Sequence, residues 1–108
     1  MDPTQLYVIK VNKPRRSEKD NARYFEINLI DDELNEYQTY VVEKYRNFKY
    51  WRDIIAVAQD DRVVRIQGIF TIKPNTVPPQ VDADSTSRYC DSHDVRDFAR
   101  VVAEKCYA

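Results

Sequence analysis

The chain contains little cysteine, little glycine and no long uninterrupted apolar sequence. Its two cysteines, Cys90 and Cys106, are too few for a disulfide framework, which favours a protein that works where thiols stay reduced. A single glycine against five prolines excludes a long flexible linker. No apolar run approaches the length that crosses a bilayer, and the N-terminal stretch lacks the basic start and apolar centre of a signal peptide. We therefore expect a cytoplasmic protein with no membrane partner.

The chain also lacks an excess of either charge. Seventeen basic and eighteen acidic residues give a formal net charge of -1, whereas domains that bind nucleic acid usually carry a net positive charge. A local basic surface stays open, because electrostatic attraction depends on where the charges lie. What the chain does have is 43% hydrophobic and 32% charged residues over 108 positions, which is typical of one compact domain.

Hydrophobic patterning predicts a mainly β protein with an internal helix. Runs rich in β-branched and aromatic residues predict strands, and apolar residues recurring every three or four positions predict helices. The predicted strands cover 5–13, 22–30, 36–43, 62–73 and, less regularly, 80–83, and the predicted helices cover 47–59 and 92–106.

The second and third predicted strands differ in how clearly their two faces separate. Residues 22–30 alternate apolar and polar side chains, which places Tyr24 and Asn28 on the outer side of a half-buried strand. In the third strand both alternations contain apolar residues, so either Tyr37 or Tyr40 can face outward.

The stretch KYRNFKYWR combines the end of the third strand with the start of a helix. Phe48 and Trp51 fall on one helical face and are expected in the core, and Asn47 is expected to cap the helix N-terminus with its side-chain oxygen. The three residues before Asn47 stay candidates for ligand contact at the strand end: Lys44, Tyr45 and Arg46.

The last predicted helix, at 92–106, carries a narrow apolar stripe. Ser92 or Asp91 is expected to cap its N-terminus. The stripe can pack on the rest of the chain or on a second copy, so a homodimer through this helix is one expectation.

The order of three strands, a helix and two more strands is that of the OB-fold, a five-stranded Greek-key barrel. FEINL in the second strand, the helix with Trp51, the glycine-bearing VVRIQGIF and the closing VDADS resemble the small phage-type OB-fold proteins that bind single-stranded DNA. The resemblance implies a mainly β fold, with an OB-fold-like domain at 1–88, a helix between strands three and four, and an added C-terminal helix at 89–108.

The resemblance also implies a non-catalytic binding site on strands two and three and the loops beside them. Exposed rings would stack bases and cations would neutralise phosphates of single-stranded DNA, or of RNA, in phage replication or recombination inside the host cell. The residues at matching positions are Lys13, Arg15, Arg16, Lys19 and Arg23 near the first loop, Tyr24, Asn28, Tyr37 and Tyr40 on the strands, Lys44, Tyr45 and Arg46 after strand three, and Lys73.

Two other functions stay open. An OB-type module that binds proteins would fit the near-neutral charge. A metal-dependent nuclease or nuclease accessory could use Asp82 and Asp84 of VDADS, although no nucleophile or phosphate-binding motif accompanies them. Cys90, His93 and Cys106 match no zinc-site spacing, so we expect neither a metal nor a cofactor.

Overall fold

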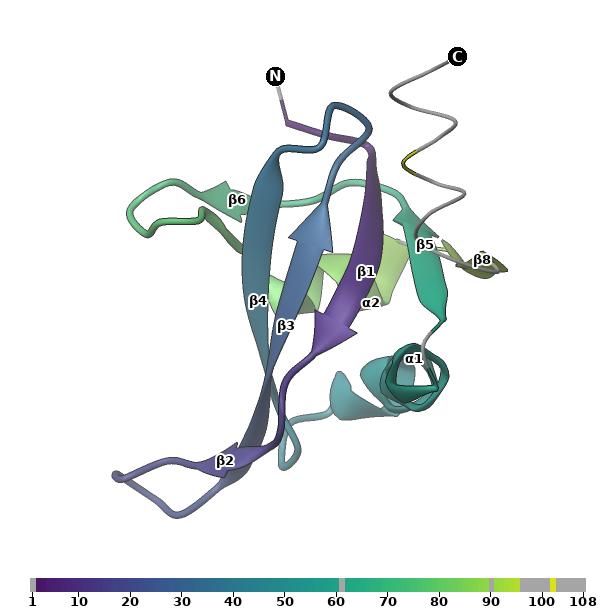
Figure 1. Cartoon of the computed structure of the whole chain (residues 1–108). Coiled ribbons are helices and arrows are strands. Elements are labelled where there is room, and N and C mark those ends of the chain that lie inside the picture. Colours follow the sequence, from purple (N-terminus) through teal and green to yellow (C-terminus); the bar gives the residue numbers. More distant parts are fainter. Residues whose placement is uncertain (1, 61, 90, 96–101, 103–108) are drawn as a thin grey trace.

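The computed structural model describes residues 2–60, 62–89, 91–95 and 102. Strands dominate this part of the chain, and the two helices lie behind and below the front strands in Figure 1. The elements are β1 (Gln5–Val11), β2 (Arg15–Arg16), β3 (Arg23–Ile30), β4 (Glu36–Val42), α1 (Phe48–Gln59), β5 (Val63–Gln67), β6 (Ile72–Lys73), β7 (Gln80–Val81), α2 (Ala83–Tyr89) and β8 (Asp91–Val95).

The described strands form one mixed sheet of eight strands in the order β6-β7-β4-β3-β1-β5-β8, with β2 paired to β3. Neighbouring strands are antiparallel except β4 and β7, which are parallel. A mainly β fold is therefore confirmed. The expected closed five-stranded barrel is not, because the hydrogen-bonded sheet of the described residues is open.

The sheet is open because the fourth predicted strand is broken in the middle. Its first half, β5, pairs with β1, and its second half, β6, pairs with β7. Residues 68–71 connect the halves without joining either ladder, and Gly68 lies at the break. A glycine within a predicted strand often accompanies such an interruption.

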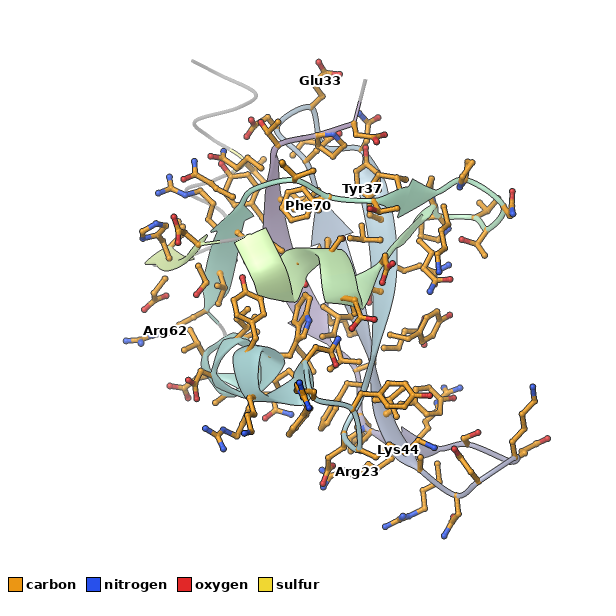
Figure 2. All side chains as sticks on the ribbon, turned by 180° about the vertical axis from the view of Figure 1, so that it is seen from behind. Arg23, Glu33, Tyr37, Lys44, Arg62 and Phe70 are labelled. Atoms are coloured by element: carbon orange, nitrogen blue, oxygen red, sulfur yellow. The ribbon has the colours of Figure 1, made fainter. Side chains whose placement is uncertain are left out.

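The main core lies between the inner face of the sheet and the helices. Alternate residues of β1, β3, β4 and β5 reach it, and Trp51 of α1 is completely buried in it. The Trp51 indole N–H donates a hydrogen bond to the carbonyl of Ala83 at 3.3 Å, which links α1 to α2. Phe70, from the connection between β5 and β6, lies inside the same core (Figure 2). The expected inward face of α1 is therefore confirmed.

The structure also decides which face of β4 is inward. Thr39 and Val41 are completely buried, whereas Tyr40 is 37% exposed. The Thr39 hydroxyl donates to the carbonyl of Val81 at 2.7 Å and so joins β4 to the segment around β7. Tyr37 shares the inward alternation and packs against the main core. Tyr40 is therefore the outward tyrosine of this strand.

The N-terminus of α1 differs from the expectation. Asn47 occupies the cap position, but its backbone is already helical and its side chain makes no capping hydrogen bond. Its Oδ1 atom is buried and has no hydrogen-bond partner among the described residues. The prediction that the Asn47 side chain caps α1 is therefore wrong, because a residue in helical conformation does not direct its oxygen at the first free N–H groups.

The end of the chain contains the largest departure from the expected elements. The segment predicted to hold a fifth strand at 80–83 has only β7 and then turns into α2, whose start is supported by a hydrogen bond from the Asp84 N–H to the Asp82 carboxylate at 3.0 Å. Residues 91–95 are strand β8, which pairs with β5 from Val63 to Gln67. A helix at 92–95, with its cap at Ser92 or Asp91, is therefore wrong.

Pairing with the edge of β5 explains that departure, because a free strand edge can recruit a short polar segment whatever its helical periodicity. The remainder of the predicted helix and the proposed dimer contact lie at 96–101 and 103–106, outside the described residues.

Candidate nucleic-acid interface

The polar segment after β1 forms a hairpin that extends β3 beyond the rest of the sheet (Figure 1). The sequence predicted only a loop here, but β2 pairs with the start of β3, with Arg15 opposite Tyr24. The turn closes through the Ser17 N–H donating to the carbonyl of Ala22 at 2.9 Å. Asn21 has a φ of 57°, a left-handed conformation that asparagine adopts more readily than most residues.

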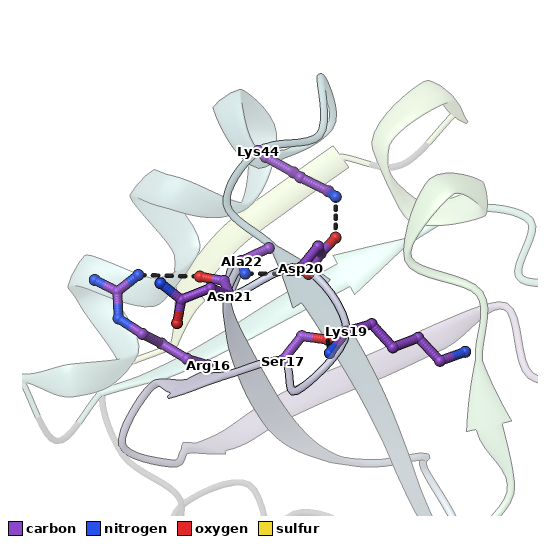
Figure 3. A network of polar contacts seen from close by, with 7 residues as sticks. All are labelled: Arg16, Ser17, Lys19, Asp20, Asn21, Ala22 and Lys44. Carbon is purple, nitrogen blue, oxygen red and sulfur yellow. Dashed lines mark hydrogen bonds and ion pairs between the residues drawn. The ribbon is translucent and has the colours of Figure 1, made fainter.

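One ion pair joins the tip of this hairpin to the turn after β4, and a second polar contact lies within the hairpin. The Lys44 ammonium pairs with the Asp20 carboxylate, and the Arg16 guanidinium donates to the carbonyl of Asn21 at 3.1 Å (Figure 3). The hydrogen bond from Lys44 holds the pKa of Asp20 below its ordinary value, and the same bond raises the pKa of Lys44. The hairpin is therefore positioned relative to β4 by ion pairing as well as by its short ladder.

The hairpin and the outer face of the β3–β4 pair border an open hollow of about 660 Å³. We call this hollow the tyrosine groove. Tyr24 and Tyr40 come from adjacent strands, and their ring centroids lie 6.2 Å apart at an interplanar angle of 60°. The residues that line the groove are Arg15, Arg16, Ser17, Glu18, Lys19, Tyr24, Tyr40 and Val42.

The ring of Tyr40 is held in place although it is exposed. Its hydroxyl donates to the Gln38 side-chain oxygen at 3.2 Å. Burial is the main cause that raises the pKa of Tyr40, and the carboxylate of Glu26 opposite raises it further. Tyr40 therefore stays a neutral phenol at physiological pH, and its ring can serve as a stacking surface.

The cations of the groove differ in how free they are to meet a ligand. Arg15 and Lys19 are exposed, and neither has an ion pair within the described part of the chain. Arg15 lies opposite Tyr24 in the ladder and therefore on the same face of the hairpin as that ring. The Arg16 guanidinium is partly engaged by the hairpin turn. Arg15 and Lys19 are the cations best placed to contact an anion beside the rings.

Several residues predicted for the interface lie elsewhere. Arg23 is opposite Arg16 and pairs with Glu43 at 3.4 Å, and its guanidinium lies 5.2 Å from the centre of the Phe25 ring. Tyr45 is 56% exposed but lies beyond the strand end, under the Lys44 ammonium.

The other predicted residues also lie outside the groove. Tyr37 packs inward, and Asn28 is on the outer face of β3, where its side-chain oxygen accepts from Asn12 at 2.8 Å. The three remaining predicted cations are exposed at separate places in the chain: Lys13, Arg46 and Lys73.

The sequence did not identify every residue of the groove. Val42 has the same outward alternation as Tyr40. The sequence alone does not show which alternation of β4 faces outward, so it does not identify Val42. Ser17 and Glu18 looked like part of a solvated charge run, and no sequence pattern indicated that the run folds back as a hairpin. The groove therefore includes a carboxylate as well as cations.

One of the two carboxylates considered for a metal, that of Asp82, is used within the fold. Asp82 accepts the N–H of Asp84 at the start of α2. Over the part of the chain that the structure describes, no group of three or more His, Cys, Asp and Glu residues is arranged to hold a metal ion. Within that same part, no helix has the length and apolar character needed to cross a bilayer.

Comparison of the chain with protein-family models, curated proteins and solved structures returned no match. The functional argument therefore rests on the tyrosine groove: two outward rings, two unpaired cations beside them, and a hairpin that fixes their arrangement. Such a surface can stack flat rings and attract an anionic backbone.

Proposed function

We propose that this chain is a non-catalytic protein that binds single-stranded DNA in the tyrosine groove. Bases stack on Tyr24 and Tyr40, and Arg15 and Lys19 neutralise the phosphates that flank them. The observation that carries the proposal is the convergence of these four side chains, from two strands and a hairpin, on a single hollow. Because every base has a flat face, stacking of this kind discriminates weakly among sequences.

The proposal includes an OB-type topology. β1, β3 and β4 serve as the first three strands, and α1 follows the third. β5 and β6 serve as two halves of the fourth strand, and β7 returns beside β4 as the fifth. The pairing of these halves with β1 and β7 supports this assignment, since the OB-fold is itself a partly open barrel. The tyrosine groove then lies on the strand face and first loop that OB-folds use for oligonucleotides.

A fluorescence anisotropy titration with labelled oligo-dT tests the proposal. With the two phosphate contacts of Arg15 and Lys19, affinity should fall by about sevenfold between 50 and 200 mM salt, because a single strand releases about 0.7 counterions per contact. A parallel titration with oligo-U shows whether RNA binds equally. The absence of binding to any single strand at 50 mM salt would refute the proposed function.

A protein-binding module is the second candidate, and the carboxylates near the rings favour it. Glu18 lines the groove, Glu26 lies opposite Tyr40, and the chain has a net charge of -1, so the positive surface is not continuous. Native mass spectrometry of the chain with oligonucleotides and with cell extract separates the two candidates. A stable protein complex together with no oligonucleotide complex supports the module.

A further inference from the structure

Glu26 is the one carboxylate on the outer face of the described β3, in the row that continues the tyrosine groove. It follows Tyr24 by two residues, so both side chains lie on the same face, and it is directly opposite Tyr40 in the ladder. Its own carbonyl accepts hydrogen bonds from the N–H and the side-chain Nδ2 of Asn12, both at 3.0 Å. The backbone that carries this carboxylate is therefore fixed.

The carboxylate of Glu26 has no hydrogen bond or ion pair among the described residues. It is half-buried beside a ring rather than extended into solvent. Arg15 lies opposite Tyr24 and Glu26 lies opposite Tyr40, and their charges shift the pKa of Tyr40 in opposite directions after the larger effect of burial. The outer face therefore presents a cation beside Tyr24 and a carboxylate beside both rings.

A carboxylate beside the rings has a chemical consequence for a strand whose bases stack on them. An ionised carboxylate only accepts hydrogen bonds and repels a phosphate, so it favours a ligand that brings donors to it. A base in a single strand exposes its Watson–Crick edge. Guanine presents two adjacent donors there, which match the two oxygens of a carboxylate, whereas thymine presents a single donor between two carbonyl oxygens.

We propose that Glu26 gives the groove a preference for guanine by accepting hydrogen bonds from the edge of a base stacked on Tyr40. This inference rests on the proposed binding of single-stranded DNA and names the base that the site favours. Cytosine and adenine, with one exocyclic amino group each, rank between guanine and thymine. The preference is superposed on binding that stacking and phosphate contacts supply for every sequence.

The test compares short oligo-dT with the same oligonucleotide carrying one central guanine, cytosine or adenine. A single guanine avoids four-stranded assemblies, and a flexible strand can slide to place it at Glu26. For the unaltered protein we expect about tenfold tighter binding with guanine than with thymine alone, the discrimination typical of a paired hydrogen-bond contact. For Glu26→Gln we expect the difference to fall below twofold.

Glu18→Gln is the matched control, because it removes a carboxylate from the same groove without altering the face of β3. It should strengthen binding of all oligonucleotides equally and keep the guanine preference. Glu26→Thr, with a residue that suits strands, provides a second variant if Glu26→Gln folds poorly, and circular dichroism checks both.

The outcomes separate the two proposals. If all oligonucleotides bind equally to the unaltered protein, or if the guanine preference survives in Glu26→Gln, base selection by Glu26 is overturned while the binding of single strands stands. If Glu26→Gln and Glu18→Gln strengthen binding by the same factor for every oligonucleotide, Glu26 acts only as a charge, which also overturns it. If no oligonucleotide binds, the proposed function itself fails.

Discussion

The two ends of the β3–β4 pair use tyrosine in opposite ways. At the turn between the strands, Asp31 accepts hydrogen bonds from the N–H groups of Glu33 and Asn35, from the Asn35 side chain and from the Tyr37 hydroxyl. At the hairpin end, Tyr24 and Tyr40 flank a groove whose main cations have no ion pair among the described residues. Figure 2 shows these ends at the top and bottom of the molecule, near Glu33 and near Lys44.

The difference teaches which polar groups serve the fold and which are available to a ligand. Burial, and to a smaller extent the hydrogen bond to Asp31, raises the pKa of Tyr37 to about 12. The hydroxyl of Tyr37 is therefore engaged within the fold. The turn end also has a hollow of about 410 Å³ lined by four carboxylates, from Asp2, Asp31, Asp32 and Glu33, and such a surface repels a phosphate backbone. The hairpin end is the only one of the two suited to an anionic strand.

The largest expected effect is the loss of stability when the hydrogen bonds at the turn end are removed. Asp31→Ala removes the acceptor of four hydrogen bonds and leaves the Tyr37 hydroxyl without that partner, so we expect the free energy of unfolding to fall by about 3 kcal/mol. Urea denaturation measures it. Glu33→Ala, on the same turn, is the control and should cost less than about 0.5 kcal/mol. The folded fraction of Asp31→Ala should still bind oligo-dT normally, and weaker binding per folded molecule would contradict the separation of the two ends.

The next largest effect is the loss of affinity for oligo-dT when a ring at the hairpin end is removed. Tyr40→Ala removes an exposed ring, and we expect oligo-dT affinity to weaken by about 1–3 kcal/mol, roughly fivefold to 150-fold, with little change in stability. Tyr24→Ala should behave similarly, because its ring contacts that of Tyr40. Tyr45→Ala is the matched control, since it removes an exposed ring outside the groove. Equal losses in Tyr40→Ala and Tyr45→Ala would argue against a stacking site in the groove.

The pH dependence of stability sharpens the comparison. Burial alone would raise the pKa of Asp31, but the hydrogen bonds from Asn35, Tyr37 and Glu33 outweigh it and hold the pKa below the ordinary value of 3.8. A depressed pKa means that the ionised form stabilises the fold above about pH 4, and that this contribution disappears as the pH falls through the folded-state pKa. Thermal unfolding of the unaltered protein and of Asp31→Asn between pH 6 and 2 measures it. The gap between their melting temperatures should narrow below about pH 4, and a constant gap would show that ionisation of Asp31 is unimportant.

The smallest effect concerns the salt dependence of binding. Arg15→Gln removes one cation from the groove and should reduce the slope of log affinity against log salt by about 0.7, the value for one phosphate contact with a single strand. Arg23→Gln removes a cation that already pairs with Glu43 and should leave the slope nearly unchanged. Titrations of oligo-dT at four salt concentrations give both slopes. A larger change for Arg23→Gln than for Arg15→Gln would place the phosphate track on the other side of the hairpin.

Sequence patterns predicted the fold best where one periodicity dominated. The alternation in β3 and the helical spacing of Phe48 and Trp51 reflect burial on one side, which a sequence records directly. The start of α2 depends on local hydrogen bonding after Asp82, and β8 depends on the open edge of β5. Neither cause leaves a strong periodicity in the sequence, so both elements were missed.

The candidate site was predictable in part, where a single alternation showed which side chains face outward. Tyr24 followed from the alternation in β3, and Arg15 and Lys19 from their place in the first loop. The choice between Tyr37 and Tyr40 required the register of β4, because both alternations of that strand include apolar residues. The pairing that withdraws Lys44 from the groove required the hairpin to bring Asp20 beside Lys44, which no local pattern indicates.

One measurement tests the central claim most directly: the NMR ring-proton shifts of the tyrosines during titration with oligo-dT at low salt. Stacked bases shift the protons of the ring beneath them, so we expect the signals of Tyr24 and Tyr40 to move as binding saturates and those of Tyr37 to stay in place. Saturable shifts at Tyr37 with no change at Tyr24 and Tyr40, or no shifts at all, would contradict the assignment of the groove as a site for single-stranded DNA.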